Sequence, residues 1–419
     1  MSAKDLVRET TEIAGKGNGH VAATAIRRGE IVGKEKPFAY VMKDDSVTDM
    51  CHECFDVSKM HFRCSKCHFA RYCGKSCQKA AWEMHKSECL RIRKNGSVKF
   101  HESVRLLGRM IDKINILEKK KEENAIRHLL SNPNETLRPD IGEKIRRRTH
   151  SNLQTYMGLD IGIDFYDELM GKVRRNAFGL ADFTSTRSCA IALLVKFSLF
   201  NHSCCPNVHI FNIGTTYLAR ALRPIRQGEE LTINYVDDLM VEPIEYRRER
   251  LRIQYLFDCT CAGCASIEAL EKNKIHTSLR IKAQDVDVSQ CVEESKSVER
   301  AAEAKMDAKD YATALSVLEK FIESSPLDHR SCYIRKLAHL AESCCYELNM
   351  WNRAIDFANI VSSAYTTFSP NNMQLGVNYF ALVCYCALVG RRDDAMRLTR
   401  MAVEIFKFNM GEHHPVTEN

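Results

Sequence analysis

The sequence predicts an α+β protein in which a β-rich part is interrupted by insertions and followed by an all-helical region. Short β-like runs such as HVAATAI, EIVGKE and FAYVM occur in residues 1–47, and similar runs return in residues 183–235. Between these segments lie a dense cysteine cluster at 51–89 and a stretch with helical spacing of apolar residues at 96–180. From about residue 270 the pattern is helical to the end.

The composition indicates a soluble chain of about two to four domains. The 419 residues are 45% hydrophobic and 27% charged, which is ordinary for globular proteins. The closest approach to a membrane span, FALVCYCALV from Phe380, is about half the required length and predicts a buried helix. The N-terminus lacks the apolar stretch of a secretory signal. We therefore expect the nucleus and the cytoplasm as locations and no membrane partner.

The net charge of +7 is too small to predict nucleic acid as the main partner. Two basic runs, KIRRRTH at Lys144–His150 and RRERLR at Arg247–Arg252, are expected to be solvated helix faces.

The chain contains 19 cysteines, and in an intracellular protein dense cysteine clusters indicate metal rather than disulfides. Ten of them belong to two clusters, at 51–89 and 259–264, and Cys204 lies in the segment NHSCCPN. The other eight mostly lie in apolar helical segments and are expected to be small buried hydrophobic residues. These are Cys189, Cys205, Cys291, Cys332, Cys344, Cys345, Cys384 and Cys386.

The first cluster has the spacing CxxC, CxxC, CxxxC and HxxxC, which supplies eight ligands and predicts two zinc ions. The segment is too short to fold on a hydrophobic core of its own. Structural zinc can stabilise such a segment, since its binding contributes roughly 10–16 kcal/mol in small fingers. No coordination position is left open for catalysis. The ligands are Cys51, Cys54, Cys64, Cys67, Cys73, Cys77, His85 and Cys89.

A weak internal repeat runs through the C-terminal region. The segments YATAL, WNRAI and RDDAM open helices at Tyr311, Trp351 and Arg392, and each helix runs toward a proline. This pattern resembles a tetratricopeptide (TPR)-type array of antiparallel helix pairs, with a generic helical bundle as the alternative.

Three further motifs flank the cysteine cluster at 51–89, which is predicted to be a zinc finger. GKGNGH, from Gly15, is not a dinucleotide-binding fingerprint because no helix pattern follows it. NHSCCPN begins at Asn201, and GEELTINYVDD precedes RRERLRIQYLFDCTCAGC. The last of these ends in CxCxxC at Cys259, Cys261 and Cys264, one ligand short of tetrahedral zinc. A nucleophilic cysteine beside His202 is a competing interpretation of the second motif.

In this order around the inserted finger, the motifs resemble the SET and MYND domain (SMYD) family of protein-lysine N-methyltransferases. The resemblance covers essentially the whole chain and implies a split SET domain with an inserted MYND finger. The implied order is SET segment 1–47, MYND zinc finger 48–92, helical SET insert 93–180, core SET 181–240, post-SET zinc segment 241–268 and TPR-like helical domain 269–419.

The resemblance implies transfer of a methyl group from S-adenosyl-L-methionine to a lysine of histones, with H3 expected first, or of other proteins, in the regulation of chromatin and transcription. The lysine must react as the neutral amine, which costs roughly 4.6 kcal/mol at pH 7 from a reference pKa near 10.4. An apolar, aromatic channel disfavours the ammonium, and much of the remaining barrier is alignment. The alternative is a catalytically weak scaffold or transcriptional cofactor that acts through the finger and the helical domain.

The resemblance also implies the site residues. Tyr235 matches the catalytic tyrosine, and His202 is expected to bind the cofactor through side chain and backbone. The implied cofactor-binding residues are Lys16, Gly17, Asn18, Asn132, Asn201, His202, Tyr235 and Phe257. The implied substrate channel contains Asn176, Phe178 and Tyr255.

Three zinc sites are implied, with interleaved pairs in the finger and Cys204 as the missing post-SET ligand. A zinc-bound thiolate is not free to attack, which argues against a cysteine nucleophile. MYND fingers imply proline-rich peptides as partners beside the protein substrate, and we expect a monomer. The implied sets are Cys51, Cys54, Cys73 and Cys77; Cys64, Cys67, His85 and Cys89; and Cys204, Cys259, Cys261 and Cys264.

Overall fold

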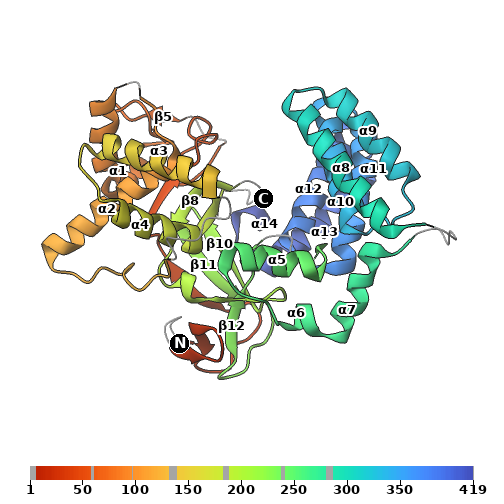
Figure 1. Ribbon diagram of the computed structural model, residues 1–419, viewed down its shortest axis with the longest axis horizontal. Coiled ribbons are helices and arrows are strands. Elements are labelled where there is room, and N and C mark those ends of the chain that lie inside the picture. The colour runs from red at the N-terminus through yellow and green to blue at the C-terminus, as the bar shows by residue number, and fades with distance from the viewer. Residues whose placement is uncertain are drawn as a thin grey trace. The chain divides into compact units, whose positions relative to one another are not determined.

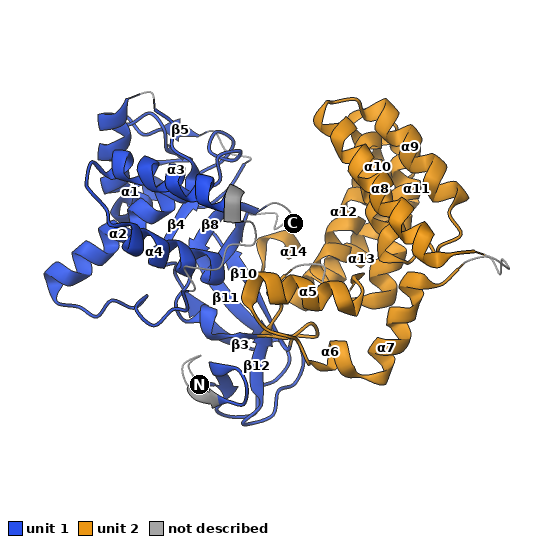
Figure 2. Cartoon of the chain, viewed as in Figure 1, with its two compact units in different colours: residues 1–201, 207–232, 419 blue, residues 202–206, 233–418 orange. Residues whose placement is uncertain are grey.

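The computed structural model describes residues 6–57, 61–96, 98–131, 139–182, 188–236, 241–279 and 286–418. The chain divides into two compact units (Figure 2). Unit 1 contains residues 1–201, 207–232 and 419, and unit 2 contains residues 202–206 and 233–418. Among the described residues, no helix is both long and apolar enough to cross a bilayer.

Small sheets join distant parts of the sequence. In the described residues the sheet orders are β1-β2-β12-β9, β10-β11-β3 and β4-β8-β7. Strand β11 alternates half-buried and buried residues with the period of two that a strand requires. The strands are β1 Val7–Ile13, β2 Gly17–Ala22, β3 Ile31–Glu35, β4 Ala39–Met42, β7 Ala177–Ala181, β8 Ser188–Leu193, β9 Asn201–His202, β10 Val208–Ile213, β11 Thr216–Ala221 and β12 Glu230–Ile233.

Strand pairing explains why the β-rich sequence returns after the insertions. Strand β11 pairs with β3, and β8 pairs with β4, so each sheet combines a strand from the first 47 residues with one from beyond residue 181. The predicted α+β class with an interrupted β-rich part is confirmed.

The cysteine-rich insertion has little regular structure of its own. It consists of a two-stranded sheet, β5 (Phe62–Arg63) with β6 (Arg71–Tyr72), and helix α1 (Lys75–Asn95). Its buried cluster contains three cysteines together with Ala70, Tyr72 and Ala81, and four partly buried cysteines pack against it. This composition fits the expectation that the segment cannot fold on apolar burial alone.

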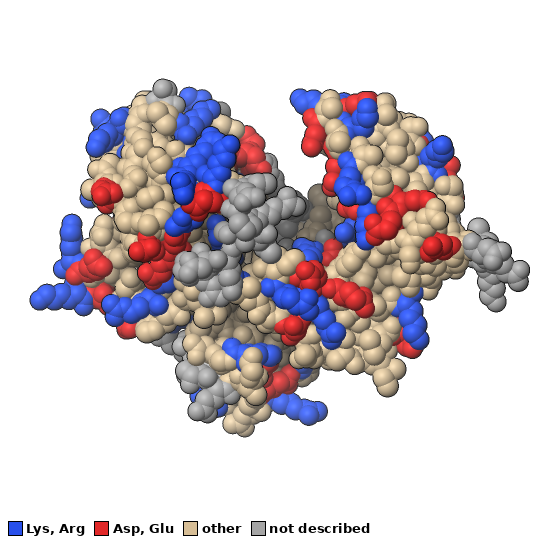
Figure 3. All heavy atoms as spheres, in the orientation of Figure 1, with Lys and Arg blue, Asp and Glu red and all other residues tan. Residues whose placement is uncertain are grey.

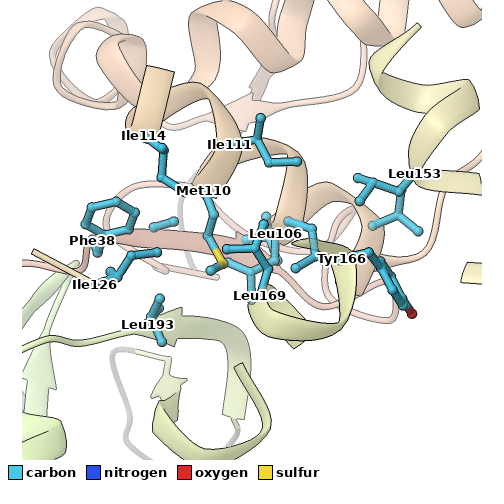
Figure 4. Close-up of a cluster of buried hydrophobic side chains, with 14 of the residues drawn as sticks. Phe38, Leu106, Met110, Ile111, Ile114, Ile126, Leu153, Tyr166, Leu169 and Leu193 are labelled. Carbon is cyan, nitrogen blue, oxygen red and sulfur yellow. The ribbon is translucent and has the colours of Figure 1, made fainter. Parts of the chain in front are cut away.

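The following helices build the main core of unit 1. They are α2 (Glu102–Lys120), α3 (Pro139–Met157) and α4 (Ile163–Asn176). Figure 4 shows Met110 of α2 among buried side chains from α4 and β8. At Gly108 a Cβ atom would lie 2.6 Å from the Tyr156 ring, so glycine is required where α2 and α3 pack closely.

Unit 2 is helical. In its described residues, α5 (Ile244–Tyr255), α6 (Ala262–Ala265) and α7 (Ile267–Asn273) are followed by six long helices that pack each on the next (Figure 1). Three of them begin at Tyr311, Trp351 and Arg392, as the repeat predicted. The last described element is α14, Pro415–Glu418. The six are α8 Val288–Asp307, α9 Tyr311–Ser324, α10 Cys332–Glu347, α11 Trp351–Phe368, α12 Met373–Leu388 and α13 Arg392–Met410.

Candidate functional site

Three groups of four cysteine or histidine residues stand out among the described residues. Within each group the ligand atoms all lie within 4.8 Å of one another. Tetrahedral zinc with Zn–S bonds of about 2.3 Å places its sulfur ligands roughly 3.8 Å apart. Cys54 and Cys73 have their sulfurs 3.7 Å apart, and Cys204 and Cys264 have theirs 3.5 Å apart. The donor sets and spacings therefore fit zinc, and the groups are the same sets of four that the resemblance implied.

Helix α1 supplies part of both finger groups. His85 and Cys89 lie on the same helix face because they are four residues apart. The Nε2 atom of His85 is 3.5 Å from the Cys67 sulfur, and its Nδ1 atom is 3.3 Å from a carboxylate oxygen of Glu88. The ring therefore presents Nε2 to the metal position and donates its other N–H to a carboxylate, the usual support of a zinc-bound histidine.

Glu88 is buried and lies beside two arginines of α2. Its Oε2 atom is 2.5 Å from Arg109 Nη2, and its Oε1 atom is 3.7 Å from Arg105 Nη1. Burial by itself would raise the pKa of the Glu88 carboxyl, but Arg109 and His85 hold that pKa well below its ordinary range. The carboxylate is therefore ionised and links the metal group to α2.

The third group, formed by Cys204, Cys259, Cys261 and Cys264, lies in unit 2. The backbone N–H of Cys204 donates to the Cys261 sulfur at 3.3 Å, and the Cys259 sulfur is 4.0 Å from that of Cys204. Cys205 is exposed and is not one of the four ligands. The division between Cys204 as a ligand and Cys205 as a spare thiol is therefore the arrangement that the structure contains.

The expectation that RRERLR is a solvated helix face is wrong for its first two residues. Arg247 is only 3% exposed, and its guanidinium donates to the Gly263 carbonyl at 2.5 Å and lies 3.7 Å from the Cys264 sulfur. Arg248 donates to the Cys259 carbonyl at 3.1 Å. Four thiolates around one dication leave excess negative charge, and the buried guanidinium offsets part of it.

His202 connects this group to the predicted catalytic tyrosine. Its Nδ1 atom accepts the backbone N–H of Tyr235 at 3.1 Å, so the ring proton is on Nε2, 3.3 Å from the Cys204 sulfur. The ring also packs against Tyr235 and Phe257, with centroid distances of 5.3 and 5.8 Å. The family resemblance implies that both the side chain and the backbone of His202 bind the cofactor. In the structure both ring nitrogens have partners within the chain, which leaves the backbone for a ligand.

An aromatic cluster surrounds Tyr235. The ring of Tyr255 is 4.7 Å from that of Tyr235, and Phe257 meets Tyr235 edge-on at 6.3 Å. The Tyr255 hydroxyl donates to the Tyr235 carbonyl at 3.3 Å, which fixes the tyrosine backbone. Leu256, with φ of 64°, ends α5 in the left-handed conformation and turns the chain between Tyr255 and Phe257.

The glycine-rich turn at GKGNGH leaves its backbone accessible. Gly15 and Gly17 have φ values of +71° and +72°, and a Cβ atom at either would have no neighbour within 4 Å. This open space allows a ligand to approach the backbone closely. Lys16, between them, pairs its ammonium with Glu230 at 2.6 Å, so its backbone rather than its side chain is available.

Asn201 is positioned against the same turn. Its side-chain amide donates to the Asn18 carbonyl at 3.1 Å. At Gly19 a Cβ atom would clash with the Ile13 side chain and lie 2.7 Å from the Asn201 amide nitrogen, so a larger residue would force these side chains to shift. Asn18 and Asn201, both predicted cofactor residues, are thus brought together in unit 1.

The predicted channel residues of unit 1 have structural partners. The Asn176 amide donates to the Leu130 carbonyl at 3.0 Å and to the Lys172 carbonyl at 2.8 Å. Phe178, on β7, lies 6.1 Å from the Tyr217 ring. Asn132 lies outside the described residues.

Glu35 is a supporting residue that the sequence does not predict. Its carboxylate accepts the backbone N–H groups of Val195, Lys196 and Phe197 at 2.8, 3.0 and 2.8 Å. These residues form the turn into the 3-10 helix Phe197–Leu199, which precedes Asn201. A single glutamate in a β-like run carries no spacing signal, so no sequence pattern identifies this role.

Comparisons with known proteins identify the family of this chain. A family model described as SET domain matches residues 17–236, more than half of the chain. The mouse histone-lysine N-methyltransferase SMYD3 is 30% identical over 432 residues, covering 100% of this chain and 96% of that protein. Human histone-lysine N-methyltransferase SMYD1 is 27% identical, covering 97% and 86%. Human N-lysine methyltransferase SMYD2 is 27% identical, covering 96% and 94%. The chain belongs to the SMYD family of SET-domain protein-lysine methyltransferases.

Proposed function

We propose that the protein transfers methyl groups from S-adenosyl-L-methionine to lysine side chains of histones and of other proteins. The observation that carries this proposal is the cluster of Tyr235, Tyr255 and Phe257, fixed through His202 to the third cysteine group. The related proteins named as histone-lysine and N-lysine methyltransferases support both substrate classes.

The aromatic cluster suits the chemistry that a lysine amine requires. The amine must lose its proton before it reacts, and closely packed aromatic rings provide a poorly solvated surface that disfavours the ammonium. The Tyr235 hydroxyl is proposed to orient the amine, because the backbone of this tyrosine is held at both ends, by His202 and by Tyr255. Alignment of the reacting atoms then supplies much of the rate enhancement.

We propose that Lys16, Gly17, Asn18 and Asn201 bind the carboxylate end of the cofactor, largely through backbone groups. His202, Tyr235 and Phe257 are proposed to bind it as well, His202 through its backbone. When bound, the cofactor supplies an electrophilic methyl group on a sulfonium centre. Asn176, Phe178 and Tyr255 remain the proposed channel residues, and Asn132 remains a proposed contact on the basis of the family resemblance.

All three cysteine groups are proposed to hold zinc in a structural role, because each offers four protein ligands and no open position. The finger is proposed to bind proline-rich peptides. On the face in Figure 3, basic and acidic side chains are interspersed, which favours a protein over a nucleic acid as the main partner. A monomer located in the nucleus and the cytoplasm completes the proposal.

The test uses the full chain loaded with zinc and methyl-labelled cofactor, against histones and a panel of cell proteins. We expect label on lysine, with a loss of about a hundredfold or more in rate for Tyr235→Phe. Cofactor affinity, measured by calorimetry, should change far less. Tyr246→Phe is the matched control, since Tyr246 lies on α5 with its hydroxyl 3.5 Å from Tyr333. Label transfer unaffected by Tyr235→Phe would contradict the assigned role.

A further inference from the structure

The helical array of unit 2 contains a pocket between α9 and α11, with a volume of about 400 Å³ (Figure 1). Helix α10 packs against both of these helices, and the loop between α9 and α10 contributes His329 to the lining. Pockets that hold ligands typically measure about 300–1,000 Å³. The pocket is therefore large enough for a long side chain or a short peptide segment.

Part of the pocket wall is apolar. Ile322 of α9 and Phe357 of α11 are 3% and 8% exposed, and Ile360 is partly buried. Because residues three apart lie on the same face of a helix, Phe357 and Ile360 present one continuous apolar surface. A surface of this kind suits a hydrocarbon chain such as the stem of a lysine or arginine side chain.

The charged part of the lining is mostly acidic. Glu319, Glu323 and Asp356 contribute three carboxylates, and Arg353 contributes one guanidinium, which pairs with Glu319 across the two helices. Three negative charges against one positive charge leave a net charge of −2 when His329 is neutral. Glu323 and Asp356 are exposed, so their charges are presented to a ligand that enters from solvent.

The Glu319 carboxyl reports the same excess of negative charge. Burial raises its pKa, and the neighbouring charge of Glu323 raises this pKa further, against the opposing effect of Arg353. A cation placed between α9 and α11 would reduce the repulsion between the two glutamates. The lining therefore combines an apolar surface with an unbalanced negative charge, which is the complement of a cation on a hydrocarbon stem.

We propose that the pocket between α9 and α11 binds an arginine- or lysine-rich segment of a partner protein. The stem of one basic side chain lies against Phe357 and Ile360, and its charged group pairs with Glu323 and Asp356. An acidic segment is excluded, because it would meet three carboxylates. The inference goes beyond the proposed function, since neither the cofactor nor methyl transfer enters it.

The test measures binding of a fluorescein-labelled hexa-arginine peptide to the full-length, zinc-loaded chain by fluorescence anisotropy. Arginine is chosen because a peptide without lysine does not probe the proposed lysine channel. We expect saturable binding that weakens as the salt concentration rises, and no binding of a hexa-glutamate peptide. Hydrogen–deuterium exchange with the arginine peptide bound is expected to slow in α9 and α11 and to stay unchanged in α2 of unit 1.

Two double variants carry the same change in charge. Glu323→Gln with Asp356→Asn removes two carboxylates at exposed positions of the pocket and should weaken peptide binding by about tenfold or more. Glu294→Gln with Glu303→Gln removes two exposed carboxylates of α8 and should bind as the native chain does. Thermal unfolding verifies that both variants are folded. The inference is overturned if the two double variants bind the arginine peptide equally, if the slowed exchange lies outside α9 and α11, or if the glutamate peptide binds as tightly.

Discussion

The carboxylate of Glu88 accepts the Nδ1–H of His85 at 3.3 Å while its other contacts reach Arg105 and Arg109 on α2. Glu88 therefore orients a metal-ligand histidine. Through its two ion pairs it also connects helix α1 of the finger to helix α2. All of these side chains are buried. A carboxylate in this position has to stay ionised, because it faces two guanidinium groups in a poorly solvated setting.

Replacement of Glu88 should weaken metal binding by the group Cys64, Cys67, His85 and Cys89. In Glu88→Gln the metal affinity of this group is expected to fall roughly 10–100-fold, the usual effect of losing a partner that orients a metal-ligand histidine. Stability should also fall by about 3–5 kcal/mol, since the buried arginines lose their countercharge. Competition with a chromogenic chelator and thermal unfolding measure the two effects. Glu83→Gln, at an exposed position of the same helix, should change neither.

Arg247 should support the third metal group in a similar way. Its guanidinium contacts Gly263 and the Cys264 sulfur, so Arg247→Leu is expected to reduce metal affinity there by roughly tenfold or more. The exposed Arg252, on the same helix, pairs with Glu249 and Asp258, and Arg252→Gln is the control. Zinc content after timed dialysis against chelator distinguishes the two variants. Equal retention of zinc would show that Arg247 has no part in holding the metal.

Glu35 should hold the segment that leads to Asn201. Glu35→Gln keeps the size of the side chain but loses the charge that strengthens three backbone hydrogen bonds. The free energy of unfolding is expected to fall by about 1.5–3 kcal/mol, with weaker cofactor binding by calorimetry. Lys34→Gln, at the exposed neighbouring position of β3, is the control. Unchanged cofactor affinity with lowered stability would limit Glu35 to a structural role.

The sequence predicted what depends on local spacing. The ligand cysteines occur as pairs two to four residues apart, and the helices that begin at Tyr311, Trp351 and Arg392 follow a local pattern of apolar residues and alanines. The α+β class and the family could therefore be inferred from the sequence alone.

The supporting partners could not be predicted because they are distant in the sequence. Glu35 binds backbone groups 160 or more residues away, and Glu88 pairs with Arg109 from the next helix. Arg247 is part of a basic run whose composition is that of a solvated helix, and only the fold brings the Cys264 sulfur beside it. The role of His202 stays a prediction, and its ring partners, the Tyr235 backbone N–H and the Cys204 sulfur, are brought to it only by the fold.

His276 is a buried, uncharged histidine of unit 2. Its ring stacks on Phe368 at 4.6 Å, and its Nδ1 atom accepts the N–H of Cys332 at 3.1 Å. Burial, together with the positive charges of Arg247 and Arg335, lowers the pKa of His276 to about 4. The pKa of a histidine in the unfolded chain is about 6.5.

Unit 2 should therefore lose stability in mild acid. Between pH 6.5 and about 4 the unfolded state binds a proton that the folded state does not, so the free energy of unfolding falls as the pH falls. The expected loss is about 2 kcal/mol at pH 5, with full stability retained above pH 7. Urea unfolding followed by the fluorescence of Trp351, in a Trp82→Phe background, reports on this unit. His276→Gln keeps a hydrogen-bond acceptor that does not titrate, so this variant should lose this part of the pH dependence. The control His339→Gln, at an exposed position of α10, should keep the pH dependence of the native chain. The same acid sensitivity in His276→Gln and the native chain would assign the effect to other groups.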